Sequence, residues 1–225
     1  MVMSARDPVA IPKPESAAEL VAALCTRAAK ARTGLAAVAN GESARPDIHV
    51  ADLVHFLTIL HGEVPSLFGR LIKTSPSLQP LLEGANVRLQ ADRRWLAELS
   101  VSTGGATDLT RISEAEIAVR EIRETMLTLA GSQREGCSLG VALAFLAEWP
   151  ELRRLFDEAG TLAFSFRWPS SPPPWPREDL QNVAEATEAV FGDARIARAI
   201  SFGSIQFSEV HGQILALADE RAAAR

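Results

Sequence analysis

Several kinds of residue and pattern are scarce in this sequence, and each scarcity excludes a class of protein. The chain of 225 residues has no tyrosine and two cysteines, Cys25 and Cys137, which are far apart and in no CxxC spacing. Two distant cysteines allow at most one disulfide and exclude a disulfide framework. No segment shows the alternation of β-branched and polar residues that is typical of a strand.

Long apolar runs are also missing. The longest uncharged apolar run, Gly136 to Ala147, is shorter than the roughly 20 residues that span a bilayer. The N-terminal stretch lacks the apolar core of a signal peptide and is interrupted by Pro8, Pro12 and Pro14. We therefore expect a soluble, reduced, cytoplasmic protein that does not contact a membrane.

Clustered positive charge is absent as well. The formal net charge is −5, and the pairs Arg93-Arg94 and Arg153-Arg154 stand near acidic residues, as on solvated helix faces. Binding of nucleic acid needs clustered basic residues that displace counterions from phosphate. Phosphate-binding glycine loops, zinc-ligand spacing and kinase signatures are not found either. We expect no nucleic-acid partner.

Helix-forming residues dominate what is present. Alanine is the most frequent residue, and together with Leu, Arg and Glu it favours helices. Capping boxes begin at Ser16 and Ser113, each with a glutamate three residues later. We predict an all-α fold, a single-domain helical bundle of about six to eight helices. Residues 1–15 form a flexible tail, and residues 16–225 form the bundle domain, with a Pro-rich loop at 167–177.

Apolar residues at helical spacing give the approximate ranges of the expected helices. A kink or break is expected near His61-Gly62, because Pro65 removes a helical hydrogen bond. Pro150 is expected to begin a new helix, and Gly160 to end it. The predicted helices cover 16–33, 51–73, the segment after Pro80 to about 102, 113 onward, 136–149, 151–160, 178–191 and 194–223.

Two histidines are the candidates for a site. His61 shares a helical face with apolar residues and is expected to point into the core, as is His211 on the last helix, whereas His55 is not. A pocket lined by His61, Glu63 and His211 would indicate a bound metal, haem or hydrophobic ligand. The simpler interpretation, which we favour, is that each histidine makes one buried hydrogen bond.

Two enzyme sites are disfavoured by the spacing of their residues. A carboxylate-bridged di-iron bundle needs two Glu-x-x-His motifs, and the only acid three residues before a histidine is Asp52. Gly136 to Gly140 matches the GxSxG pattern of α/β-hydrolases, but no strand precedes it to form the required turn. Gly136 and Gly140 are instead expected to let a neighbouring helix or a flat ligand approach closely.

The Pro-rich segment carries tryptophan at both ends, Trp168 and Trp175. A polyproline segment flanked by aromatic residues is a possible ligand for a partner domain. The commoner arrangement is a stiff loop whose aromatic side chains cover the end of the bundle.

Three strings, DLVHFLTILHGEVP, REGCSLGVALAFLAEW and RAISFGSIQF, resemble those of an uncharacterised bacterial family of small helical proteins without an assigned activity. The resemblance implies an all-helical fold and no particular function. The string EGCSLG, residues 135–140, is similar to the start of the glycine-rich helix of bacterial haem oxygenases. That resemblance implies a haem-oxygenase-like bundle. The stretch LVAALCTRAAKARTGL, where those enzymes carry their axial histidine, has none, so catalysis on haem is not implied.

The sequence thus favours a bacterial binding or interaction module without catalytic residues or a metal site. Its partner would be an unknown protein or a small hydrophobic ligand, and a homodimer is possible. The alternative is a haem- or hydrophobic-ligand-binding protein of the haem-oxygenase kind. No cofactor is firmly implied, and haem enters only with this alternative.

Overall fold

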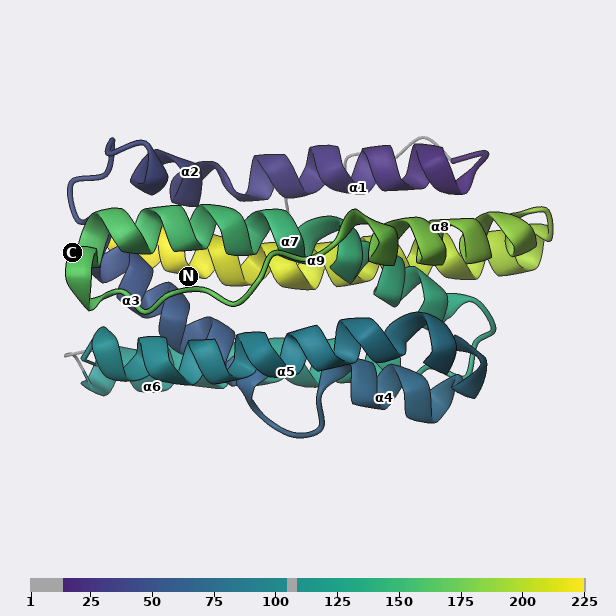
Figure 1. The fold of residues 1–225 in the computed structure, drawn as a ribbon, viewed down its shortest axis with the longest axis horizontal. Coiled ribbons are helices and arrows are strands. Elements are labelled where there is room, and N and C mark those ends of the chain that lie inside the picture. Colours follow the sequence, from purple (N-terminus) through teal and green to yellow (C-terminus); the bar gives the residue numbers. More distant parts are fainter. Residues whose placement is uncertain (1–13, 105–108, 225) are drawn as a thin grey trace.

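The computed structural model describes residues 14–104 and 109–224, except for the side chains of 109–113 and 166. Helices are arranged in three layers, and the described residues include no strand (Figure 1). The prediction of an all-α bundle is confirmed. The outer layer on one side holds α1 (Ala17–Ala31) and α2 (Thr33–Ala39). The middle layer holds α7 (Cys137–Phe164), α8 (Arg177–Phe191) and α9 (Ala194–Ala223).

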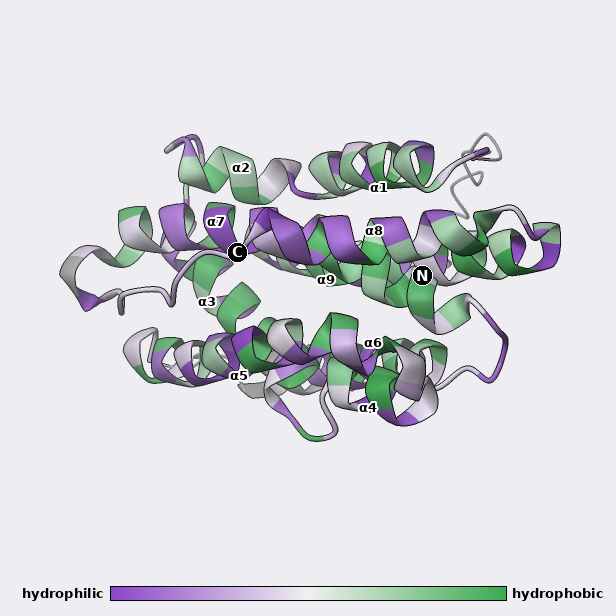
Figure 2. Cartoon of the chain, turned by 45° about the vertical axis from the view of Figure 1, so that its right-hand side comes forward, coloured by the Kyte–Doolittle hydropathy of each residue, from purple (hydrophilic) through white to green (hydrophobic). Residues whose placement is uncertain are grey.

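The third layer holds α4 (Leu67–Thr74), α5 (Gln79–Ser102) and α6 (Leu109–Ala130). Helix α3 (Pro46–Leu57) runs from the middle layer to the third and continues as a π-helical turn, η1 (Thr58–Gly62) (Figure 1). Short 3₁₀ turns, η2 (Pro76–Leu78) and η3 (Ser165–Arg167), precede α5 and follow α7. Hydrophilic residues line the outer face of α8 (Figure 2). None of the described helices combines the length and the hydropathy needed to cross a membrane.

The first half of α7 is the most deeply buried segment, and it packs along α9. An added Cβ on Gly140 would lie 2.1 Å from the backbone oxygen of Ile200, and one on Gly203 would lie 2.3 Å from that of Cys137. Ser204 Oγ donates a hydrogen bond to the Gly140 carbonyl at 2.9 Å. The two glycines therefore allow the helix backbones to touch, as predicted for Gly140.

The helix starts agree with the sequence in part. Ser16 caps α1 by accepting a hydrogen bond from the Glu19 N–H, as predicted. The prediction that Ser113 begins a helix with a capping box is wrong, because α6 begins at Leu109 and Ser113 lies inside it. The predicted helix 51–73 is broken, as expected near His61-Gly62, and α4 restarts behind the cap Ser66.

Helix α7 runs through Pro150 and Gly160, and the predicted boundaries at both positions are wrong. Buried side chains stand on both sides of Pro150, so packing in the middle layer outweighs the loss of one hydrogen bond. Arg32 donates an additional hydrogen bond to the nearby Glu148 carbonyl. Gly160 makes room for the Trp168 ring, which lies 2.1 Å from where a Cβ would be.

Residues 168–176, here called the strap, connect η3 to α8 and are held down by their polar groups. The buried Asp92 accepts hydrogen bonds from the indole N–H of Trp149 at 2.7 Å and of Trp175 at 2.8 Å. Arg153 Nε lies 2.9 Å from the same carboxylate, and Arg153 Nη2 donates a hydrogen bond to the Pro172 carbonyl. The strap is therefore a fixed covering of the bundle, as the commoner interpretation had it.

Candidate functional site

Three ionisable side chains from different elements form a buried hydrogen-bonded chain. His61 Nε2 of η1 lies 3.2 Å from His211 Nε2 of α9. His211 Nδ1 lies 3.2 Å from Glu148 Oε2 of α7. All three residues are less than 5% exposed. We call Glu148, His211 and His61 the buried triad.

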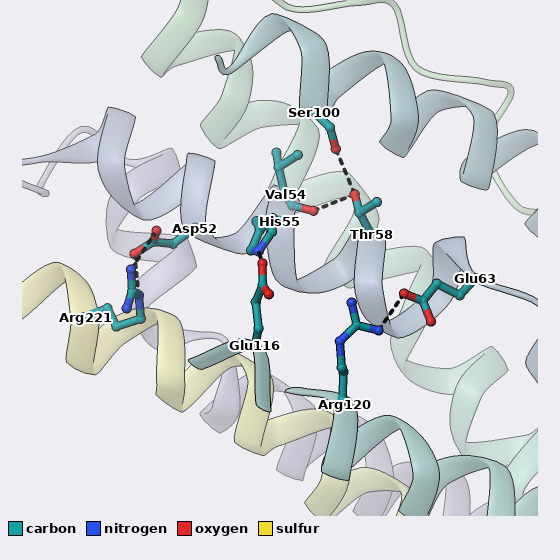
Figure 3. A network of polar contacts seen from close by, with 9 residues as sticks. All are labelled: Asp52, Val54, His55, Thr58, Glu63, Ser100, Glu116, Arg120 and Arg221. Atoms are coloured by element: carbon teal, nitrogen blue, oxygen red, sulfur yellow. Dashed lines mark hydrogen bonds and ion pairs between the residues drawn. The ribbon is translucent and has the colours of Figure 1, made fainter. Parts of the chain in front are cut away.

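The π-helical turn gives His61 its position. A π-helical turn is wider than an α-helical turn and shifts the residues that follow it around the helix axis. Thr58, the first residue of η1, is held by bonds from its hydroxyl to the Val54 carbonyl at 2.7 Å and with Ser100 Oγ at 3.0 Å (Figure 3). At the other end of the turn, Arg93 donates two hydrogen bonds to the Gly62 carbonyl. The turn is thus anchored to α5 at both ends.

Aromatic rings enclose the two imidazoles. The His61 ring lies 4.8 Å from the Trp149 ring and 5.7 Å from the Phe145 ring, between centroids. The Phe207 ring lies 5.3 Å from that of His211. These rings leave no room for a substrate between the histidines, which touch one another directly.

A small cavity of about 10 Å³ lies beside Glu148 and His211, between α1, α7 and α9. This is the space of about one water molecule. Arg32 and Ser208 contribute the other polar groups to its wall. Glu148 Oε1 and Arg32 Nε are buried without a hydrogen-bond partner, as is His61 Nδ1 elsewhere in the triad.

The surroundings of the triad disfavour additional positive charge. Burial lowers the pKa of His61 well below the usual range of histidine. The neighbouring His211 and the guanidinium groups of Arg123 and Arg93 lower that pKa further. Burial also lowers the pKa of Arg32 at the cavity. His61 is therefore neutral at neutral pH.

The predicted pocket residues are brought together only in part. His61 and His211 point into the core and meet, and His55 lies at the surface against Glu116 (Figure 3). Glu63 is partly exposed and pairs with Arg120 at 2.9 Å (Figure 3). The residue that does contact His211 is Glu148, which the sequence analysis did not single out. Its signal was a single acid in the otherwise uncharged segment 136–149.

The donor set of the triad does not suit a metal ion or haem as it stands. Among the residues that the structure describes, no group of three or more His, Cys, Asp or Glu side chains is placed to hold a metal. A haem would need a cavity next to a histidine, and the space beside His211 is about 10 Å³.

Ser138, the serine of the GxSxG match, is buried, and its Oγ lies 3.4 Å from the Ala130 carbonyl oxygen.

A second feature is a surface groove of about 410 Å³ between α6 and α9. Its apolar wall consists of small or aliphatic side chains, namely Ala115, Ala118, Leu217 and Ala224. Its polar residues are Glu114, Glu220 and Arg221. Arg221 is engaged by Asp52 of α3 at 2.9 Å (Figure 3), whereas both glutamates are exposed.

Comparison with known proteins gives a family and no activity. A family model, described as a family of unknown function (DUF6975), matches residues 21–225. No curated protein and no solved structure matches the chain. The resemblance to haem oxygenases therefore has no counterpart among the matches.

Proposed function

The chain belongs to that family of unknown function. From this premise we propose that the protein is a non-catalytic binding module. In this proposal the groove between α6 and α9 binds a helix of a partner protein. The single observation that supports this function is the contrast between the two candidate sites. The convergent ionisable groups of the triad are sealed in the core, and the groove of about 410 Å³ is on the surface. Such a molecule acts through its surface.

The shape of the groove favours a helix as its occupant. The lining residues of α9 and its C-cap are at positions 217, 220, 221 and 224, a spacing that follows one helical face for two turns. At 1.5 Å per residue this stripe is about 10 Å long. Alanine side chains on both walls allow a third helix to approach closely, in the helix-in-groove mode of recognition.

The charge of the groove favours a basic partner helix. Glu114 and Glu220 are exposed at its edges, and the positive charge of Arg221 is balanced by Asp52. The chain as a whole carries a formal net charge of −5. We therefore propose a helix with small apolar residues on one face and Lys or Arg beside that face. We place this module in the bacterial cytoplasm, where its two free cysteines would stay reduced.

The test is a binding titration with a fluorescein-labelled synthetic helix that has alanine and leucine on one face and lysine beside it. We expect saturable binding by fluorescence anisotropy, weakened at least tenfold by Ala118→Trp, because the indole would fill the groove. Ala29→Trp, on an exposed site of α1, is the matched control and should bind like the unmodified protein.

A second peptide with glutamate in place of lysine separates charge complementarity from hydrophobic attachment. It should bind at least tenfold more weakly than the basic peptide at low salt, because like charges would face Glu114 and Glu220. Equal binding of the basic peptide to the Ala118→Trp variant and the unmodified protein would refute the groove as its site.

A further inference from the structure

The buried triad is a second polar link between the middle and third layers, beside the network of Asp92, Trp149 and Arg153. Glu148 and His211 belong to the middle layer, and His61 belongs to η1, which is anchored to the third layer. The proposed groove makes no use of this chain of polar groups. A buried polar network needs an account of its own, since each unpaired polar atom in a core is costly.

The distance between the histidines sets how many protons they carry. Two Nε2 atoms at 3.2 Å are within hydrogen-bond range, which requires one proton between them. Without that proton, two lone pairs would face each other. A second proton would either place two N–H groups face to face here or leave a charged N–H at His61 Nδ1, which is buried without an acceptor.

Glu148 supplies the reason for holding a positive charge here. Within the described chain its carboxylate has one ion-pair partner, His211. A buried carboxylate without a cation is strongly destabilised. His211 Nδ1–H donates to this carboxylate, and the positively charged guanidinium of Arg32 lies on the wall of the same cavity. The remaining carboxylate oxygen and Arg32 Nε border the cavity of about 10 Å³, where one water could bond to both.

The other charged groups around His61 oppose a second proton. Arg93 of α5 donates to the Gly62 carbonyl, and Arg123 of α6 donates to the Pro65 carbonyl at 3.0 Å. Glu63, the nearest acid in sequence, faces Arg120 and Arg123 instead. On the side of α7, the ion pair of Arg153 and Asp92 is internally balanced. A doubly protonated His61 therefore has no carboxylate to move toward inside the core.

We propose that Glu148, His211 and His61 form a proton-operated latch, in which one shared proton holds η1 against α9 and the uptake of a second proton makes His61 a buried cation without a carboxylate partner and so releases η1 with the loop 63–66. The latch goes beyond the proposed function and does not depend on it. The segment that it releases ends in exposed residues, with Val64 79% exposed, and its release uncovers the buried Ile59 and Leu60 of η1. The lowered pKa of His61 places the opening below the usual titration range of histidine.

The test is hydrogen exchange of the full chain by mass spectrometry between pH 7.5 and 4.5, with rates corrected for the intrinsic effect of pH. We expect residues 58–66 to lose at least tenfold of their protection as the pH falls, while α5 and the first half of α7 keep theirs. His61→Gln has no second proton to accept, so this step should vanish whether the variant is open or closed.

His55→Gln is the matched control, because His55 lies six residues earlier in the same segment and bonds to Glu116 at the surface. It should keep the step. Two results would overturn the latch. One is an unchanged step in His61→Gln. The other is the loss of protection at 58–66 and in α5 and α7 together, which is global acid unfolding.

Discussion

Glu148 shows how a single residue changes the interpretation of its neighbours. With Glu148 on its Nδ1, His211 has a fixed ring orientation and presents Nε2 to His61. A carboxylate that orients a histidine in this way is common at functional sites. Here the oriented imidazole of His211 contacts the imidazole of His61, and no space for a substrate lies between them.

The pH dependence of stability is the first prediction at this scale. The pKa of His61 is lowered in the folded protein, so between that value and about 6.5 the unfolded chain binds more protons. The free energy of unfolding therefore falls as the pH drops below about 6.5, by up to about 1.4 kcal/mol per pH unit. Urea titrations at pH 5 and 6 measure this slope. In His61→Gln the slope should be smaller by one proton, and an equal slope would contradict the assignment to His61.

Asp92 carries the second prediction. Asp92→Ala would leave the indole N–H groups of Trp149 and Trp175 and the Arg153 guanidinium without their shared acceptor. Removing one partner from a buried charged network costs about 3–5 kcal/mol. We expect a loss of that size in chemical denaturation.

Asp157→Ala is the control for Asp92. Asp157 accepts hydrogen bonds from Trp168 and Ser171 but is partly exposed, so its removal should cost about 1 kcal/mol. Losses of equal size in the two variants would show that burial of Asp92 is not the decisive factor.

Burial raises the pKa of Asp92, and the two indole donors and Arg153 act against that rise.

The candidate site could be predicted in part. Helical spacing placed His61 and His211 on inward faces, because apolar neighbours three and four residues away mark the buried side. Spacing along one helix does not say which helices are neighbours, so the contact with Glu148 was not predictable. Glu63 was named as a third pocket residue, and in the structure it pairs with Arg120 and Arg123 instead.

At the scale of elements, the crossing of α7 and α9 depends on two glycines. Gly140→Ala would place a Cβ 2.1 Å from the Ile200 carbonyl oxygen. That contact is with backbone, so the helices must separate, at a cost of about 1–3 kcal/mol or more. Thermal unfolding of the variant measures this loss.

Gly192→Ala, between α8 and α9, is the control for Gly140. Nothing lies within 4 Å of a Cβ added there, and Gly192 has φ −64, which alanine adopts without strain. It should be neutral or stabilising by up to about 1 kcal/mol, through the entropy of the unfolded chain. If both variants had the same melting temperature, the crossing would not depend on Gly140.

Helix positions followed from the sequence more closely than helix ends. The apolar stripes gave α1, α5, α8 and α9 with ends near those observed. Pro150 and Gly160 were misinterpreted as boundaries because local propensity was weighed without packing, and burial on both sides of Pro150 outweighs it. The π-helical turn could not be predicted from the spacing of apolar residues, because it depends on contacts of Thr58 and Gly62 with α5.

At the scale of the whole molecule, the three layers share one core, which predicts cooperative unfolding. The four tryptophans lie near one another in the region of Asp92, on α5, α7 and the strap. Their fluorescence therefore reports contact between layers, whereas far-ultraviolet circular dichroism reports all helices. We expect the two signals to change together in urea. A fluorescence change that precedes the loss of helix would indicate that the layers separate first.

The order of the layers also bears on how the protein is made. Helix α1 packs against α7, α8 and α9, and α3 packs against α7 and α9, so both helices are made before the helices that they pack against. Ribosomes add about 5–20 residues per second. The amphipathic α1 is therefore synthesised on the order of 10 s or longer before α9 leaves the exit tunnel. During synthesis the nascent chain thus exposes the apolar face of α1 until its partner helices are made.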